Sequence, residues 1–216
     1  NLLGRLILTV GHELNEQNKR GLDLNGNPGA DLFALTTQTN GYSNIAGYDP
    51  NTAGSFATAK LANANARDLK PSDYKIVYNA SQEPSLIRMS DGKTFNASST
   101  PPLTAATLDA GYPADGLVFT VPATISAASQ NGQSVLFQPF DRAASEVQSL
   151  LHNPDELAAA SALTANINKE NQGTLQLSQL GAIITPLNIP AKEDPVRLTF
   201  DGAGQVTYQT YNHLTN

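Results

Sequence analysis

Three histidines are the residues best suited to proton transfer or metal binding, and they stand far apart in the chain. His12, His152 and His213 have no partner at the spacing of a metal-binding motif. The adjacent acids Asp155-Glu156 and Glu193-Asp194 are typical of helix starts and loops rather than of a general acid and base. The sequence has no Cys, no phosphate-binding Gly-rich loop and no Gly-x-Ser-x-Gly turn. We predict no catalytic residue, no cofactor and no metal site, and we expect that the protein is not an enzyme.

The segment Asp23-x-Asn25-x-Asn27 resembles the start of a calcium-binding loop. Pro28 then occupies the glycine position of that motif, and Ala34 stands where its bidentate Glu is required. Asp and Asn side chains commonly accept hydrogen bonds from their own turn. We therefore predict a locally capped turn.

Tyrosine rings could stack on a sugar, but no Trp is present to reinforce them. The tyrosines form no obvious platform in the sequence; they are Tyr42, Tyr48, Tyr112, Tyr208 and Tyr211. Carbohydrate binding stays open as an alternative. A hydrolase, which needs a cluster of His, carboxylate and hydroxyl groups, also stays open.

The composition limits the class of protein and its partners. The chain has 216 residues, a net charge of -6 and 6% aromatic residues. An acidic balance disfavours nucleic acid and anionic membranes as partners. The apolar run Leu6 to Val10 is too short to span a bilayer. The chain opens on Asn1 without a signal-peptide pattern, which we interpret as an internal fragment of a longer polypeptide.

A helix is predicted at the start of the chain, because its apolar residues recur at three- and four-residue steps. These residues are Leu3, Leu6, Ile7, Val10 and Leu14. Gly21 is predicted to be the left-handed C-cap. Two interpretations of the apolar face stay open. It packs into the core of this chain, or it packs against further helices of a longer rod.

Strands are predicted from alternating apolar and β-branched residues separated by turns. They cover residues 74–78, 86–89, 94–95, 116–121 and 134–138, then 175–177, 196–200 and 205–209. Asp91-Gly92, Asn131-Gly132 and Asp201-Gly202 mark turns. Short helices are predicted at Arg142 to Leu151 and Asp155 to Ala160, and one helical turn near Phe56 to Ala64.

These elements predict a mainly β protein with helices, of the α+β class. We expect residues 1–35 to be the end of an inner helical domain with its turn. Residues 36–70 form an irregular connection, and residues 71–161 an antiparallel β domain ending in short helices. Residues 162–216 are a linker and part of a second β domain.

Five ordered motifs resemble the flagellar hook-associated protein 1 family, the hook–filament junction proteins of bacteria. They cover Leu14 to Phe33, Pro71 to Ile76, Ile87 to Phe95, Asp115 to Ala144, and Asn153 to Ser161. The first is a helix end followed by a Gly-x-Asp-x-Asn-Gly turn. Together they span about residues 1 to 161.

The resemblance implies a structural role outside the cell, after export in the unfolded state through the flagellar type III apparatus. It implies self-assembly into a ring, with the hook protein and other hook-associated proteins as partners. Terminal helices would make the axial contacts, so we expect this fragment alone to be monomeric. The alternative is a secreted β-rich binding module or adhesin for carbohydrate or a host surface.

Overall fold

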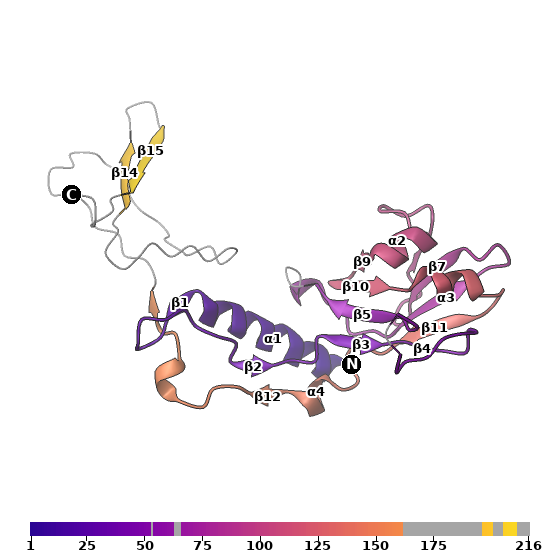
Figure 1. The fold of residues 1–216 in the computed structure, drawn as a ribbon, viewed down its shortest axis with the longest axis horizontal. Helices are drawn as coiled ribbons and strands as arrows, with labels where there is room; N and C mark the ends of the chain where they lie inside the picture. Colours follow the sequence, from indigo (N-terminus) through magenta and orange to yellow (C-terminus); the bar gives the residue numbers. More distant parts are fainter. Residues whose placement is uncertain (53, 63–65, 162–195, 201–204, 211–216) are drawn as a thin grey trace. The chain divides into compact units, whose positions relative to one another are not determined.

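The computed structural model describes residues 1–52, 54–62, 66–161, 196–200 and 205–210 (Figure 1). Contacts divide the chain into two units, residues 1–17 with 31–152 and residues 18–30 with 153–216. A long helix, several antiparallel sheets and a few short helices make up the described part. This confirms the predicted α+β class. The predicted domain boundaries at residues 35, 70 and 161 stay predictions.

The first element is helix α1 (Leu2–Lys19), as its apolar spacing predicted. The prediction for Gly21 was wrong, because this residue is not left-handed and instead opens strand β1 (Gly21–Leu22). A Cβ atom at Gly21 would lie 2.2 Å from the backbone oxygen of Ala158. The position therefore needs glycine because a second stretch of backbone passes against it.

Two antiparallel sheets follow, drawn toward the right in Figure 1, and we call them together the β domain. The four-stranded sheet has the order β3 (Gln38–Asn40), β5 (Thr58–Leu61), β10 (Leu117–Thr120), β9 (Tyr112–Ala114). The five-stranded sheet has the order β4 (Tyr42–Ser43), β11 (Ser134–Phe137), β6 (Tyr74–Tyr78), β7 (Pro84–Arg88), β8 (Thr94–Phe95). The strands predicted between residues 74 and 138 are confirmed.

The core of the β domain lies between the inner faces of these sheets. Residues alternate between buried and partly exposed along β6, as expected for a half-buried strand. The ring of Phe119 lies 5.0 Å from that of Tyr74 and 5.3 Å from that of Phe137. Helices α2 (Ala105–Ala110) and α3 (Ala123–Ala128) add Leu108 and Ile125 to the same core. Aromatic and aliphatic burial thus joins the two sheets.

Residues 36–70 contain more regular structure than the predicted irregular connection. They hold β3, β4, β5 and the 3₁₀ helix η1 (Ala66–Asp68). The helical turn predicted near Phe56 to Ala64 was wrong, because β5 lies there and pairs with both β3 and β10. Its buried positions include Ala59, whose small side chain gives little β signal in the sequence.

Between residues 142 and 161 the helices are shorter than predicted, so both predicted helices were wrong in extent. Helix α4 covers only Ala143–Glu146, and the 3₁₀ helix η2 only Pro154–Glu156. Strand β12 (Gln148–Ser149) pairs with β2 (Phe33–Ala34), and β13 (Ala160–Ser161) pairs with β1. Backbone pairing to segments distant in sequence decides this conformation over local helix propensity.

Strands β14 (Val196–Phe200) and β15 (Val206–Thr210) form the predicted antiparallel hairpin, with Leu198 opposite Tyr208. The predicted Asp201-Gly202 turn and the strand at 175–177 lie outside the described residues. So do the predicted linker and Glu193-Asp194.

Candidate functional site

The structure does not gather the candidate catalytic residues. His12 lies on α1, His152 is exposed in the segment after β12, and His213 lies outside the described residues. Within the described ranges, no group of three or more His, Cys, Asp and Glu side chains is placed to hold a metal ion. No helix of the described part is long and apolar enough to cross a membrane.

The Asp23 turn is capped by its own side chain, as predicted. Asp23 Oδ1 accepts hydrogen bonds from the backbone N–H of Asn27 at 2.7 Å and of Asn25 at 2.9 Å. The bond from the Asn27 backbone is the main cause that lowers the pKa of the Asp23 carboxyl. This carboxylate therefore serves its own turn.

The candidate tyrosines that the structure describes lie in different environments. The Tyr48 hydroxyl donates to the backbone oxygen of Gly41 at 2.5 Å. Buried Tyr112 donates to the backbone oxygen of Pro101 at 3.0 Å. Tyr42 is exposed on β4 and Tyr208 on β15, in different units of the chain, and Tyr211 lies outside the described residues. Among the described residues, no observation favours carbohydrate binding.

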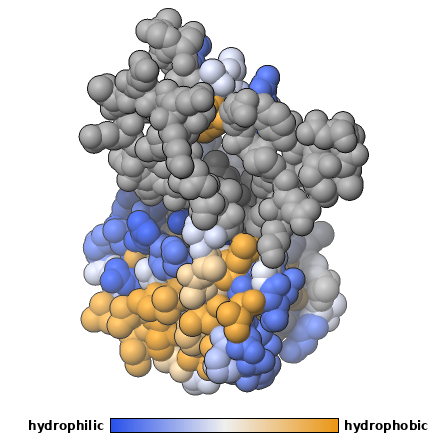
Figure 2. Space-filling view, turned by 90° about the vertical axis from the view of Figure 1, so that its left-hand side faces the viewer, coloured by the Kyte–Doolittle hydropathy of each residue, from blue (hydrophilic) through white to orange (hydrophobic). Residues whose placement is uncertain are grey.

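The most unusual surface is the apolar face of α1, which we call the leucine stripe. Five of its side chains are 43–71% exposed, and they are Leu2, Leu3, Leu6, Val10 and Leu14. Figure 2 shows hydrophobic residues gathered over one region of the described surface. The interpretation that this face packs into the core of this chain was therefore wrong. Packing against other helices stays a prediction.

The opposite face of α1 is the buried one, and small residues make that possible. Its buried positions are Gly4, Leu8, Gly11, Asn15 and Asn18. A Cβ at Gly4 would lie 2.2 Å from the backbone oxygen of Phe140, and one at Gly11 would lie 2.7 Å from Leu35 Cδ2. Phe140 and Leu35 therefore approach α1 on the face that carries its two glycines.

Two buried asparagines fix extended backbone onto this face. Asn15 Nδ2 donates to Phe33 O, and Asn15 Oδ1 accepts from the backbone N–H of Leu32 and Phe33, all at 2.9 Å. Asn18 Nδ2 donates to Ala30 O at 2.8 Å. Asn18 Oδ1 accepts from the backbone N–H of Ala158 at 2.9 Å. The backbone of a helix is already paired within the helix, so it cannot bond a neighbouring extended segment. The side-chain amides of Asn15 and Asn18 supply those hydrogen bonds instead.

Sequence reasoning missed both asparagines. The available signal was a second face of the same helix, carrying Gly4, Gly11, Asn15 and Asn18 at three-, four- and seven-residue steps. Small and amide side chains on one face of a helix are suited to close backbone approach.

One flank of α1 is tied to the segment around η1. Thr9 Oγ1 donates to Ala66 O at 3.2 Å, and Arg67 forms an exposed ion pair of 2.6 Å with Glu13. Exposed pairs of this kind contribute little to stability, because water and salt screen the two charges. With one face buried and one flank engaged, the leucine stripe is left facing solvent.

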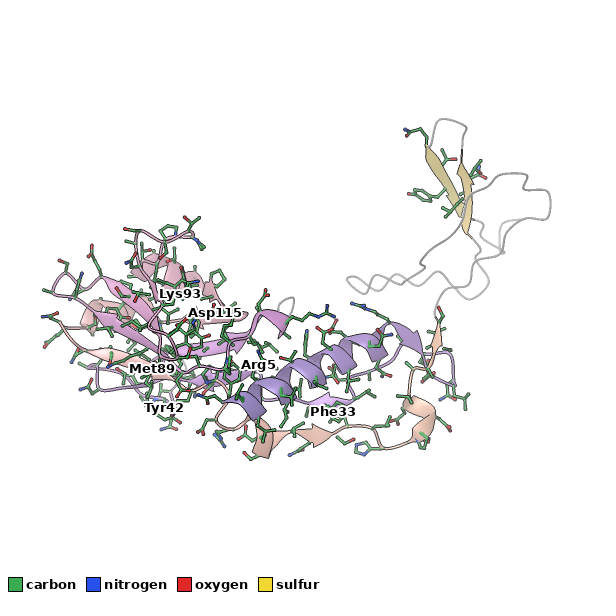
Figure 3. The ribbon with its side chains drawn as sticks, turned by 180° about the vertical axis from the view of Figure 1, so that it is seen from behind. Arg5, Phe33, Tyr42, Met89, Lys93 and Asp115 are labelled. Atoms are coloured by element: carbon green, nitrogen blue, oxygen red, sulfur yellow. The ribbon has the colours of Figure 1, made fainter. Side chains whose placement is uncertain are left out.

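Inside the β domain, a charged cluster ties the two sheets together. Asp115 precedes β10 and accepts hydrogen bonds from Tyr74 Oη at 3.0 Å and Arg88 Nη1 at 2.9 Å. Arg88 also pairs with Asp91 at 2.5 Å (Figure 3 labels Asp115). Burial, followed by the Asp115 charge, raises the pKa of the Tyr74 hydroxyl. The hydrogen bonds from Arg88 are the main cause that lowers the pKa of Asp91. We interpret this cluster as structural.

Comparison with known proteins shows what most of the chain resembles. No family model matches it. It is 29% identical over 161 residues to flagellar hook-associated protein 1 of Salmonella typhimurium, and equally so to that of Salmonella typhi. The predicted resemblance to flagellar hook-associated protein 1 is confirmed. The match covers 74% of this chain, and the chain spans about a quarter (26%) of the length of these relatives.

A solved structure agrees with the sequence match. The flagellar hook junction protein FlgK from Burkholderia pseudomallei superimposes with a TM-score of 0.51 and 26% identity. That match covers 74% of this chain and 26% of the solved chain. The alternative of a secreted adhesin has no support from these relatives, which are all named as flagellar proteins.

Proposed function

We propose that this chain is part of a structural, non-catalytic component of the bacterial flagellum, at the junction between hook and filament. The names of its relatives support the flagellar assignment. The observation that carries the structural role is the leucine stripe, a surface suited to permanent assembly. The location follows as extracellular, with hook protein and other hook-associated proteins as neighbours in the flagellum.

The stripe has the geometry of a helix-packing surface. Leu3, Val10 and Leu14 repeat at seven- and four-residue steps, with Leu6 beside them, as in helices that pack along their length. Exposed apolar surface costs about 25 cal/mol per Å² relative to its burial. Side chains left this exposed on a helix indicate a surface that is covered in the assembled protein. We propose that further helices of the full-length polypeptide cover it and extend into a self-assembled ring.

The stripe alone is too small to hold two copies of this fragment together. It offers five exposed apolar side chains, whereas stable interfaces involve about 20–30 residues from each partner. The fragment is therefore expected to be monomeric, and the ring to require the full-length protein.

The proposal is tested in a bacterium that makes the full-length protein. Antibodies raised against the β domain should label the hook–filament junction of isolated flagella in electron micrographs. Absence of the protein from flagella would refute the proposed function.

A second arm tests the stripe itself. Leu6→Glu combined with Val10→Glu places two charges on the packing surface, so filaments should fail to assemble on the hook. Gln17→Glu is the matched control, since Gln17 is an exposed polar residue of the same helix. Normal filaments in the double variant would show that the stripe takes no part in assembly.

A further inference from the structure

Asparagine followed by glycine occurs three times in the sequence, as Asn25-Gly26, Asn40-Gly41 and Asn131-Gly132. Such a pair can lose its side-chain amide without an enzyme, because glycine has no Cβ atom to shield its backbone nitrogen. That nitrogen gives up its proton to solvent and bonds to the carbonyl carbon of the Asn side chain. The bond from this carbon to Nδ2 then breaks, and Nδ2 leaves as ammonia.

The five-membered ring formed in this way is opened by water to aspartate or isoaspartate. One amide and one water molecule thus become one carboxylate and one ammonium ion, with no oxidation or reduction. In isoaspartate the main chain runs through the former side chain and is longer by a methylene group. The structure decides which of the three pairs can reach this reaction.

The Asn40-Gly41 pair is held firmly at the end of β3. Asn40 Nδ2 donates to the backbone oxygen of Pro50 at 3.2 Å, and the Gly41 N–H donates to that of Ala57 at 2.8 Å. A Cβ atom at Gly41 would lie 2.4 Å from Val135 Cγ1, so neighbouring atoms crowd this glycine. Ring closure here requires opening of the sheet itself.

The Asn25-Gly26 pair is exposed but lies beside a carboxylate. Asp23 Oδ1 accepts a hydrogen bond from the Asn25 backbone N–H at 2.9 Å, and the Gly26 N–H donates to the backbone oxygen of Asp23 at 3.1 Å. Attack by the glycine nitrogen builds negative charge on that nitrogen and then on the side-chain oxygen. The Asp23 carboxylate disfavours both charges, so this pair should react slowly.

The Asn131-Gly132 pair is the least restrained of the three. It lies in the exposed turn between α3 and β11 (Figure 1). Among the described residues, the Asn131 side-chain amide has no hydrogen-bond partner. Gly132 has a φ of 81° and open space where a Cβ atom would lie. Its N–H donates to the backbone oxygen of Tyr78 at 2.9 Å, just beyond the β6–β11 pairing. The reaction requires this bond to open, and bonds at the end of a strand pair open more readily than those at its centre.

We propose that Asn131 is a site of spontaneous deamidation, with water as the only co-reactant. Asn25 reacts more slowly, and Asn40 reacts least while the chain is folded. The product places a new negative charge at the turn before β11, and the isoaspartate form also lengthens the main chain beside Gly132. This inference does not depend on the proposed function.

The test compares the 216-residue chain in its folded and unfolded states. Both samples are kept in the same mildly alkaline buffer, one of them with guanidinium chloride, and peptide mass spectrometry follows each pair with time. In the folded chain, Asn131 should deamidate severalfold faster than Asn25, and Asn40 least of all. In the unfolded chain the three pairs should react at similar rates, because only their shared local chemistry remains.

Asn131→Gln is the matched variant, because it keeps a neutral amide but would have to close a larger ring. Ion-exchange chromatography should show that the acidic species formed fastest by the folded parent is missing from this variant. The proposal would be overturned if that species formed as fast in the variant. Equal or faster reaction at Asn25 or Asn40 in the folded chain would also overturn it. So would an intact Asn131 in a folded chain whose unfolded form deamidates.

Discussion

The buried amide of Asn15 gives the most direct test of how α1 holds the rest of the chain. Asn15→Ala removes three hydrogen bonds of 2.9 Å and leaves the N–H groups of Leu32 and Phe33 and the Phe33 carbonyl without that partner. Each unsatisfied buried group costs about 1–3 kcal/mol. Leu32 and Phe33 are only partly buried, so water compensates part of the loss. We expect a loss of about 2–4 kcal/mol in the free energy of unfolding, out of about 5–15 kcal/mol for a typical domain.

Two measurements check this expectation. Urea denaturation followed by circular dichroism gives the free energy of unfolding of the parent chain and of Asn15→Ala. Because the chain has two units whose transitions need not coincide, native-state hydrogen exchange at the Leu32 and Phe33 amides supplies the local measurement. Both amides should exchange at least about tenfold faster in the variant.

The control is Gln17→Ala, an exposed position on the same helix, which should change stability by less than about 0.5 kcal/mol. The reasoning would be refuted if Asn15→Ala also stayed within about 0.5 kcal/mol of the parent with unchanged exchange at Leu32 and Phe33. The side-chain amide would then contribute nothing beyond what solvent provides.

Three further outcomes are expected. Gly4→Ala should lose about 1–3 kcal/mol in urea unfolding, because its Cβ would lie 2.2 Å from Phe140 O, while Leu3→Ala should change little. Asp91 has a lowered pKa in the folded state, so its stabilising contribution is present above about pH 4 and is lost as the pH falls below that value. An Asp91→Asn variant should lose less stability between pH 7 and pH 3 than the parent, and equal losses would contradict the pairing with Arg88. The isolated 216-residue chain should sediment as a monomer, and a stable closed ring would contradict the role proposed for further helices of a full-length polypeptide.

Much of the β domain could be predicted because its signals are local. Alternating side chains in Tyr74–Tyr78 and a left-handed glycine at Gly92 need only neighbouring residues to be recognised. The antiparallel pairing of β6 with β7 follows from the short connection between them.

Other elements depended on partners that the sequence does not reveal. Residues 142–160 carry helix-like signals, yet β12 and β13 pair with β2 and β1, more than 100 positions earlier in the chain. Strand β5, with Ala59 and Lys60 at its centre, is fixed by two neighbouring strands rather than by its own propensity.

The sequence by itself determined where α1 lies and that it has one apolar face, because a 3.6-residue period is a property of the segment alone. Only the tertiary structure decided which face is buried. Backbone oxygens approach closely at Gly4, and amide groups at Asn15 and Asn18 bind extended chain, so the polar and small face turns inward. The periodicity of the sequence indicates that two faces of α1 differ in polarity. Hydrogen bonds and close contacts with residues distant in sequence decide which of these faces is exposed to solvent.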